Sequence, residues 1–424
     1  MPLRSPRQGN AFGVLDIGTS KTVCFIVSGA ELRTGGRRRR EGVRVLGCGS
    51  KPSRGVKAGV VIDHDGAEQA VRAAVTQAEQ AAGMTIDQVY LAVNCGGLQS
   101  RTFTADTRVD GGQVKIRHLN SLRAAGRRYV ERDGSKLLHM NVLSYRLDTT
   151  TSMSEPLGMA GQKLAADLHV VTVDDAPLRS LANVVERAGY DVLGFAAAPH
   201  ASGVACTTAE DRRSGVICVD LGAGTTTLSM FSGGHLLFLD AHATGGQHLT
   251  FDISRGLSTP FDQAERIKTL YGTLDIAASE EQGMVAYTLA GEEEPTLYQT
   301  SKSRIRGIVT ARVADLLNRV AERIERSGTS RLAAQKVVLT GGGSGLPGLV
   351  AFAERTLGRP VQVAQAQPVA GLQAPWCQPQ FATAIGLTQI AVDPGAGTRR
   401  TQSSVRPEAP SYITRVGQWL RKGF

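Results

Sequence analysis

The chain has 424 residues, of which 42% are hydrophobic and 20% are charged, a composition that excludes global disorder and favours two or more folded domains. It contains no apolar run near the roughly 18–20 residues of a membrane-spanning helix, no secretory signal, and six scattered cysteines without a CxxC pair, so we expect a cytoplasmic protein with reduced cysteines. Its net charge of +10 lies almost wholly in two segments, because residues 29–44 hold six arginines against two glutamates and residues 399–424 hold six basic residues against one glutamate.

Strands alternate with helices along the first part of the chain, which predicts an α/β fold. An apolar strand at Gly13–Ile17 runs into a polar turn, and Thr22–Ser28 is expected to be its hairpin partner. A helix is expected at about 65–82, with Asp63 and Asp65 as N-cap candidates and Gly83 as its end.

The opening pattern returns about 200 residues later. Val216–Asp220 is an apolar strand that ends in aspartate, and a Gly/Thr turn leads to a return strand that reaches Phe231. This repetition predicts two similar domains that face each other. Residues 300–327 form a long helix with an apolar stripe of period 3.6, and Lys336–Leu339 is expected to be a buried strand.

The two turns, Asp16–Lys21 and Asp220–Thr225, are suited to wrap a polyphosphate. Glycine lets backbone N–H groups approach phosphate closely, and an aspartate at a strand end can hold Mg²⁺ through its water ligands. One such turn alone is typical of an ordinary loop. Two copies on matching strands, together with a glycine run at 341–343 after a third strand, predict a nucleotide site.

This arrangement resembles the actin-like ATPase superfamily, which implies an actin-like (ribonuclease H-like) two-domain fold with ATP and Mg²⁺ in a cleft. The resemblance assigns phosphate and Mg²⁺ contacts to the two turns, and it assigns the metal to Asp16 and Asp220, acting through water. Residues of the first domain in this role are Asp16, Gly18, Thr19, Ser20 and Lys21. Those of the second domain are Asp220, Gly222, Gly224 and Thr225.

Further positions follow from the same resemblance. Gly245 and Gly246 are similar to the small-residue turn at the start of the upper subdomain of the second domain. Glu265 and Lys268 would hold the ribose hydroxyls, although a surface pair on a helix is the alternative. Gly342 and Gly343 would lie under the adenine.

Within the superfamily the chain resembles the FtsA family of bacterial cell-division proteins. The features that carry this are an insert at 88–167, the order of the pieces from PFDQAERIKTLYG to KVVLTGGGSGLPGL, and the ending QWLRKGF. The resemblance implies six segments: 10–87, 168–203 and 369–392 as the first actin-like domain (1A); 88–167 as the inserted α+β subdomain (1C); 204–249 and 335–368 as the second domain (2A); 250–334 as its upper subdomain (2B); 393–410 as a flexible linker; and 411–424 as a membrane-targeting amphipathic helix.

The C-terminal helix has a physical basis of its own. Its apolar residues fall on one arc of a helical projection and its basic residues on the other side, which is the make-up of a helix that lies in a bilayer interface. Packing on the body or on a partner is the alternative, which the long linker disfavours. The residues expected to contact the membrane are Ile413, Val416, Trp419, Leu420, Arg421, Lys422 and Phe424.

One departure from the wider superfamily concerns hydrolysis. Chaperone and rod-shape relatives start the helix after the last strand of the first domain with Glu-Pro, whereas this chain has Ala197-Ala198-Pro199-His200. No carboxylate is therefore present there to position the attacking water, and we expect ATP turnover to be slow or incidental.

The function implied by the resemblance is to anchor the tubulin-like protein FtsZ to the cytoplasmic membrane at the septum and to assemble into actin-like filaments. The partners would be FtsZ, other divisome proteins through the insert, further copies of the chain, and anionic lipid. FtsZ is expected on residues 250–334, with Arg312 and Asp315 as candidate contacts, and solvated helix charges are the alternative for both residues.

Three other classes remain as alternatives. A sugar or acetate kinase would need a carboxylate base near the γ-phosphate, and no acid that follows the first turn would serve. A pilus-assembly ATPase would not need the C-terminal helix. A nucleic-acid binder is disfavoured because the basic segments lack aromatic stacking platforms. The arginine-rich loop at 33–44 receives no role, since a solvated hairpin tip accounts for it.

Overall fold

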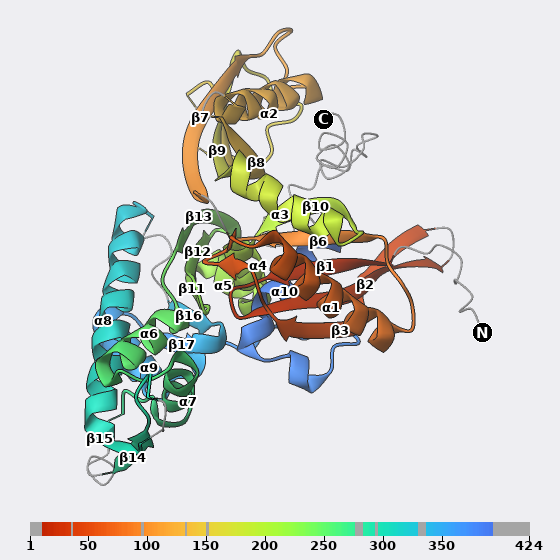
Figure 1. Cartoon of the computed structure of the whole chain (residues 1–424). Coiled ribbons are helices and arrows are strands. Elements are labelled where there is room, and N and C mark those ends of the chain that lie inside the picture. Colours follow the sequence, from red (N-terminus) through yellow and green to blue (C-terminus); the bar gives the residue numbers. More distant parts are fainter. Residues whose placement is uncertain are drawn as a thin grey trace, which may run out of the picture.

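A computed structural model describes residues 11–34, 37–94, 97–131, 134–149, 152–275, 283–292, 296–329 and 336–392 of the chain. Two α/β domains lie side by side, and a smaller unit of strands and one helix stands on top of them in the view of Figure 1. This architecture confirms the expected α/β class with an inserted α+β unit. The expected linker at 393–410 and the expected membrane helix at 411–424 lie outside the described residues.

The first domain is built on a five-stranded sheet with the order β10-β6-β1-β2-β3. Strands β1, β2 and β3 are antiparallel neighbours, whereas β6 runs parallel to both β1 and β10. The elements of this domain are β1 (Ala11–Ile17), β2 (Lys21–Thr34), β3 (Arg37–Pro52), β4 (Val56–Lys57), β5 (Val60–Val61), α1 (His64–Ala82), β6 (Gln88–Val93), α3 (Asp175–Arg187) and β10 (Asp191–Ala197).

Helix α1 has the ends that the sequence predicts. The Asp63 side chain accepts hydrogen bonds from the backbone N–H groups of Asp65 and Gly66, and Gly83 closes the helix in the left-handed conformation at φ +66°. The helix packs its small residues against β2 and β3, where an added Cβ at Gly49 would lie 2.1 Å from the carbonyl oxygen of Ala74. Glycine in the strand therefore sets the close approach of helix and sheet.

The second domain repeats this design. Its sheet has the order β13-β12-β11-β16-β17, in which β11 and β12 form an antiparallel hairpin and β16 runs parallel to β11. Two matching hairpins, each flanked by a parallel strand, confirm the duplicated domain. The elements are α5 (Ala209–Ser214), β11 (Val216–Leu221), β12 (Thr226–Ser232), β13 (His235–His242), α6 (Gly246–Leu257), α7 (Phe261–Tyr271), β14 (Met284–Tyr287), β15 (Tyr298–Ser301), α8 (Lys302–Arg326), β16 (Lys336–Thr340), η1 (Gly342–Gly345), α9 (Leu349–Leu357) and β17 (Val361–Val363).

Two helices fill the space between the sheets. Helix α4 (Ala198–Cys206) packs on the second sheet, α10 (Ala382–Val392) packs on the first, and the two helices pack on each other. Two short turns, η2 (Ala374–Trp376) and η3 (Pro379–Phe381), lead into α10. The far face of the second sheet is covered by α6, α8 and α9, and the expected apolar stripe of α8 is buried there.

The insert is a three-stranded sheet with the order β7-β9-β8 and a single covering helix. Its elements are β7 (Gln99–Arg108), α2 (Ile116–Glu131), β8 (Ser135–Leu147) and β9 (Lys163–Asp174). The expected limits of 88–167 are wrong at both ends. Strand β6 pairs with β1 and β10 in the first domain, and β9 pairs with β7 and β8 along its whole length as far as Asp174.

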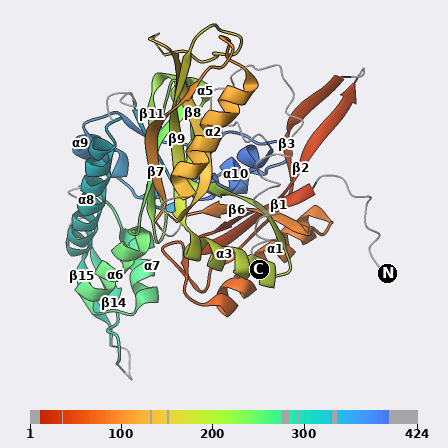
Figure 2. The ribbon, with the colours of Figure 1, turned by 90° about the horizontal axis from the view of Figure 1, so that it is seen from above.

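The reason for the second error lies in how β9 is buried. Its last apolar residues, Val171 and Val173, belong to the core of the first domain, which gives this stretch the continuous apolar pattern of a domain strand. The insert also contacts both domains, since His139 Nε2 accepts a hydrogen bond from the Ala197 backbone N–H at 2.8 Å and Ser100 Oγ accepts one from Leu239 at 3.0 Å. Figure 2 shows the insert over the junction of the two domains.

No helix among the described residues is both long enough and apolar enough to cross a bilayer.

Candidate functional site

The two glycine turns expected to bind phosphate have the same geometry. In the first, the Gly18 N–H donates a hydrogen bond to the Lys21 carbonyl oxygen at 3.0 Å. In the second, the Gly222 N–H donates to the Thr225 carbonyl oxygen at 2.9 Å. Each turn therefore closes the hairpin between two antiparallel strands immediately after an aspartate, as the sequence predicts.

The structure brings these two turns into contact. A Cβ added to Gly224 would lie 2.2 Å from Thr19 Oγ1, so only glycine permits this approach. Asn94, at the end of β6, donates a hydrogen bond through Nδ2 to Thr225 Oγ1 at 2.6 Å. Residues from three strand ends and both domains thus meet at one point.

The two aspartates at this point are held in an unfavourable environment for negative charge. Burial and the neighbouring Asp220 carboxylate raise the pKa of Asp16 to about 7, and Lys21 opposes this rise. Burial raises the pKa of Asp220 to about 6, against the effects of a Thr383 hydrogen bond and of Lys21. Burial also lowers the pKa of the Lys21 ammonium. Two desolvated carboxylates with one cation beside them form a site that favours additional positive charge.

The start of α10 and the turn η3 before it complete this site, and sequence reasoning missed them. Thr383 Oγ1 donates to Asp220 Oδ2 at 3.2 Å, and the Lys21 ammonium lies 5.3 Å from the centre of the Phe381 ring. Gly341 adopts φ +81°, and a Cβ there would lie 2.3 Å from Asp220 Oδ1. Thr383 and Phe381, at the start of α10 and just before it, therefore contact Asp220 and Lys21 respectively.

The expected small-residue turn lies directly on the second glycine turn. The Gly246 N–H donates to the Gly222 carbonyl oxygen at 2.9 Å, and a Cβ on Gly245 would lie 2.4 Å from that same oxygen. Helix α6 begins at Gly246, so its N-terminal backbone N–H groups lie beside the phosphate-type turn.

Glu265 and Lys268 lie together beside the start of α6. The Lys268 ammonium donates to Glu265 Oε2 at 2.6 Å and to Thr250 Oγ1 at 3.0 Å, and Thr250 Oγ1 donates to Glu265 Oε2 at 2.5 Å. Lys268 also donates to the Gly246 carbonyl oxygen at 3.4 Å. These residues form a polar cluster of α6 and α7, and not a separate surface pair.

The glycine run after β16 forms the short helix η1. A Cβ on Gly343 would lie 3.0 Å from the carbonyl oxygen of Leu221, whereas Gly342 is exposed and its nearest neighbour, Gln380 Cβ, is 3.9 Å away. The structure thus places Gly343 against the strand end of Asp220 and leaves an open face at Gly342.

Asp16 and Asp220 are the carboxylates of this site. Within the described residues, no group of three or more His, Cys, Asp or Glu side chains is arranged to hold a metal ion. A cation at this point would therefore complete its coordination with water or ligand oxygens.

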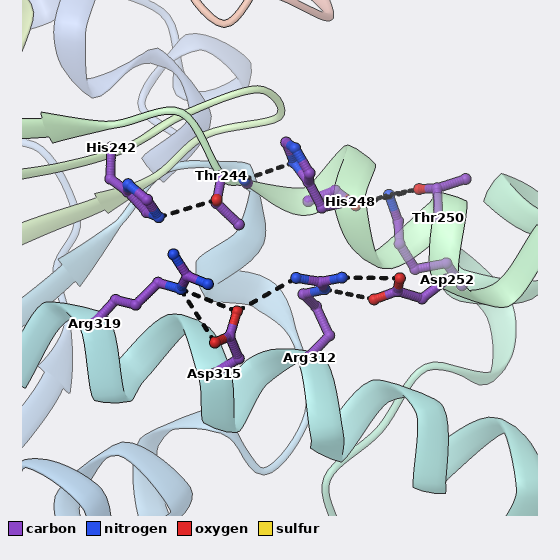
Figure 3. Close-up of polar contacts among 11 residues, drawn as sticks. His242, Thr244, His248, Thr250, Asp252, Arg312, Asp315 and Arg319 are labelled. Atoms are coloured by element: carbon purple, nitrogen blue, oxygen red, sulfur yellow. Dashed lines mark hydrogen bonds and ion pairs between the residues drawn. The ribbon is translucent and has the colours of Figure 1, made fainter.

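Arg312 and Asp315, the tentative partner contacts, take part in ion pairs on α8 (Figure 3). Arg312 binds Asp252 of α6 through two nitrogens, and its second guanidinium nitrogen lies 2.9 Å from Asp252 Oδ1. This hydrogen bond raises the pKa of Arg312. Asp315 accepts from Arg312 at 3.4 Å and from Arg319 at 3.1 Å. The Arg312 side chain is 27% exposed and that of Asp315 is 41% exposed, so both are ion-paired charges that solvent reaches, and a partner contact at these residues stays a prediction.

Protein-family models match two parts of the chain. The model described as cell division protein FtsA matches residues 217–386, and the model of the SHS2 domain inserted in FtsA matches residues 96–172. The second range agrees with the position of β7 to β9 and not with the expected start at residue 88.

Similar proteins span the whole chain. Cell division protein FtsA of Agrobacterium fabrum (strain C58) is 36% identical, covering 100% of this chain and 97% of its own length. The protein of that name from Escherichia coli (strain K12) is 27% identical over 97% of each chain.

Two solved structures share the fold. The PilM–PilN type IV pilus biogenesis complex gives a TM-score of 0.63 at 19% identity, covering 92% of this chain and 100% of that chain. MreB5 of Spiroplasma citri bound to ADP gives a TM-score of 0.51 at 13% identity, covering 92% and 97%. At these identities the likeness concerns the fold alone, which is actin-like.

Proposed function

This chain belongs to the FtsA family of cell-division proteins, and we propose that it binds Mg²⁺-ATP between its two actin-like domains and anchors FtsZ filaments to the cytoplasmic membrane at the septum. In the same proposal it assembles with other copies of itself into actin-like filaments. The observation that carries the nucleotide part is the contact of two matched glycine turns beside two desolvated aspartates.

The residues present fit a Mg²⁺-bound triphosphate. The backbone N–H groups of Gly18, Gly222 and Gly246 already donate to carbonyl oxygens within the site. Other N–H groups of the two turns would donate to phosphate oxygens, and the glycines of the turns let the phosphates approach closely. Asp16 and Asp220 would hold the Mg²⁺ through its water ligands. The Mg²⁺ ion would supply the positive charge that neutralises the phosphates. Lys21 would add a cation of the protein itself.

The sugar and the base of the nucleotide would be bound by residues that flank the two glycine turns. Glu265 and Lys268 would bind the ribose hydroxyls, and the open face at Gly342, next to Gly343, would receive the adenine. Helix α4 begins with Ala198-Pro199-His200 and has no acid in its first turn, so ATP would serve mainly to hold the two domains together. MreB5, which shares the fold, is described as bound to ADP.

The membrane and partner roles rest on family membership and on the C-terminal sequence. Members of this family are named as cell division proteins, which favours that role over the pilus-assembly and kinase alternatives. FtsZ would bind residues 250–334, other divisome proteins would bind the insert, and residues 411–424 would lie on anionic lipid at the cytoplasmic face.

Reconstitution on vesicles tests the proposal as a whole. With ATP present, the full chain should bring soluble, fluorescent FtsZ to vesicles that contain phosphatidylglycerol, and a chain that lacks residues 411–424 should leave FtsZ in solution. Co-sedimentation and fluorescence microscopy both measure this result. FtsZ recruitment that does not depend on residues 411–424, or no recruitment by the full chain, would contradict the proposed anchoring role.

The partner surface requires a variant that leaves the α6–α8 ion pair in place. Arg312→Glu should weaken FtsZ binding by about tenfold or more. It also places a glutamate beside Asp252 and Asp315, which repel it, and it leaves Asp252 without its ion pair. The double variant Asp252→Arg with Arg312→Asp keeps an ion pair while it reverses the charge on α8.

We expect this double variant to have the melting temperature of the parent. Its affinity for FtsZ, measured by fluorescence anisotropy, should nevertheless be as weak as that of Arg312→Glu. Parent-like FtsZ affinity in the charge-swapped protein would place the partner elsewhere on the subdomain.

A further inference from the structure

Strands β2 and β3 extend well beyond the sheet to which they belong. The pairing of β1 with β2 ends at Ala11 opposite Ser28, whereas β2 and β3 stay paired as far as Thr34 opposite Arg37. The distal part, 29–34 with 37–43, is therefore a ribbon of two strands, and no third strand pairs with it among the described residues. Figures 1 and 2 both show this ribbon projecting away from the body.

The ribbon carries the arginine-rich loop to which the proposed function gives no role. Its register places Arg38 opposite Arg33, Arg39 opposite Leu32 and Arg40 opposite Glu31. The register thus brings the four consecutive arginines of β3 opposite residues 31–34 of β2. The segment 29–44 holds six arginines and two glutamates.

This placement is unfavourable for the isolated ribbon. Like charges directly opposite each other destabilise a strand pair, and a two-stranded ribbon is only marginally stable by itself. An anionic surface against the distal end would relieve the repulsion between Arg33 and Arg38. The charge pattern therefore points to an anionic partner at the end of the ribbon.

The composition and the position of the ribbon favour lipid as that partner. Residues 29–44 contain no aromatic residue that could stack on a base. The other basic segment, 399–424, includes the proposed membrane helix. Helix α10, from which the tail leaves, packs on β1 and β2, the second of which continues into the ribbon. Helix α10, the last described element of the chain, therefore lies in the same domain as the ribbon.

We propose that the arginine ribbon, residues 29–34 and 37–43, is a second membrane contact that adsorbs on the headgroups of anionic phospholipid. The inference rests on the proposed membrane role of the C-terminal helix and extends it. One helix alone leaves the body free to rotate about its linker, whereas a second contact fixes which face of the first domain is turned to the membrane. Two weak contacts on one chain also bind more tightly than either alone.

The test replaces the four consecutive arginines in the full-length chain. The variant with Arg37→Gln, Arg38→Gln, Arg39→Gln and Arg40→Gln should bind vesicles of phosphatidylglycerol and phosphatidylcholine at least tenfold more weakly than the parent at moderate salt. Each basic residue near an anionic surface contributes about a fivefold factor, and some of these residues lie off the surface. The matched variant with lysine at the same four positions should bind within about threefold of the parent.

Two further measurements separate this proposal from the one on which it rests. The variant Trp419→Glu should retain a weak, salt-sensitive binding to anionic vesicles. Adding the four glutamine substitutions to this variant should abolish that remaining binding. If the glutamine variant binds vesicles as the parent does while Trp419→Glu does not, the ribbon proposal fails and the helix remains the anchor. If neither change affects vesicle binding, the membrane role itself fails.

The rival partner and the fold are measured on the same proteins. Loss of duplex DNA binding by the glutamine variant, with vesicle binding unchanged, would assign the ribbon to nucleic acid and overturn the proposal. Equal loss with lysine and with glutamine would also overturn it, because the contact would then not depend on charge. Parent-like melting temperature and nucleotide affinity of the glutamine variant show that the body is intact, and a loss of vesicle binding then supports the ribbon contact.

Discussion

Asp16→Asn should remove most of the gain in ATP affinity that Mg²⁺ provides, and it should stabilise the nucleotide-free protein. Asp16 is desolvated beside Asp220, so its charge is unfavourable until a cation arrives. The amide cannot attract the metal, and we expect Mg²⁺-ATP affinity to fall about 10- to 100-fold, the range seen when partners of a metal site are lost. Isothermal titration calorimetry with and without Mg²⁺ measures the change.

The same carboxylate makes both stability and binding depend on pH. The pKa of Asp16 is about 7 in the fold and near its ordinary value of 3.8 in the unfolded chain, so the folded state binds more protons between these values. The nucleotide-free parent should therefore lose stability as pH rises from 4 to 7, and Asp16→Asn should lose less, because only the raised pKa of Asp220, about 6, then remains. The stabilisation by Asp16→Asn should thus be largest near pH 8 and vanish near pH 4. Each kcal/mol of added stability should raise the melting temperature by about 2–4 °C.

Binding of the metal should show the opposite slope. Mg²⁺ requires ionised carboxylates, so Mg²⁺-ATP affinity of the parent should fall as pH drops below 7, approaching about tenfold per pH unit for each proton released. The exposed Asp110→Asn in the insert is a matched control that should alter neither quantity. Unchanged Mg²⁺-ATP affinity in Asp16→Asn would remove Asp16 from the nucleotide site.

Much of the fold could be predicted because its signals are local. The strand, aspartate, glycine turn and return strand occur within 20 residues in each domain, and both hairpins form where that pattern stands. Helix α1 likewise begins and ends at residues whose side-chain or backbone preference marks a terminus, namely Asp63 and Gly83. These features depend little on distant parts of the chain.

The limits of the insert could not be read in the same way. Apolar runs in β6 and β9 have similar composition, yet β6 pairs within the first domain and β9 pairs within the insert. A strand buried by packing on a neighbouring domain has the same sequence pattern as a strand buried within its own domain. Strand pairing over long separations decides the limit, and single-sequence patterns carry no information about it.

The candidate site was predicted in its turns and missed in its supports. Thr383 lies 163 residues from Asp220 in the chain, and Phe381 lies still farther from Lys21. They reach these residues only because α10 packs between the sheets. Asn94 follows an apolar strand as Asp16 does, and this polar residue at a strand end is the signal that could have indicated it. Arg312 was correctly placed on the polar side of α8, but its partner Asp252 lies on another helix.

Trp419→Glu should release the single chain from anionic vesicles almost completely. The expected membrane helix has Trp419 and Leu420 at the centre of its apolar arc, and burial of one large apolar side chain contributes roughly 1.5–3 kcal/mol. Loss of that term alone weakens binding about 10- to 150-fold, and the glutamate adds repulsion from anionic headgroups. Arg421→Ala keeps the apolar arc, so it should weaken binding only a few-fold and make it more sensitive to salt.

The measurement has to be made where copies of the chain do not act together. A filament presents many helices to one surface, and the resulting avidity can hide the loss of one weak contact. Vesicle co-sedimentation at low protein concentration, without nucleotide that would promote assembly, reports the affinity of single chains. Under those conditions Trp419→Glu should stay in the supernatant while Arg421→Ala divides between the two fractions. If Trp419→Glu sediments with vesicles as fully as the parent does, the helix at 411–424 is not the anchor, and the basic residues elsewhere in the chain must carry the membrane contact.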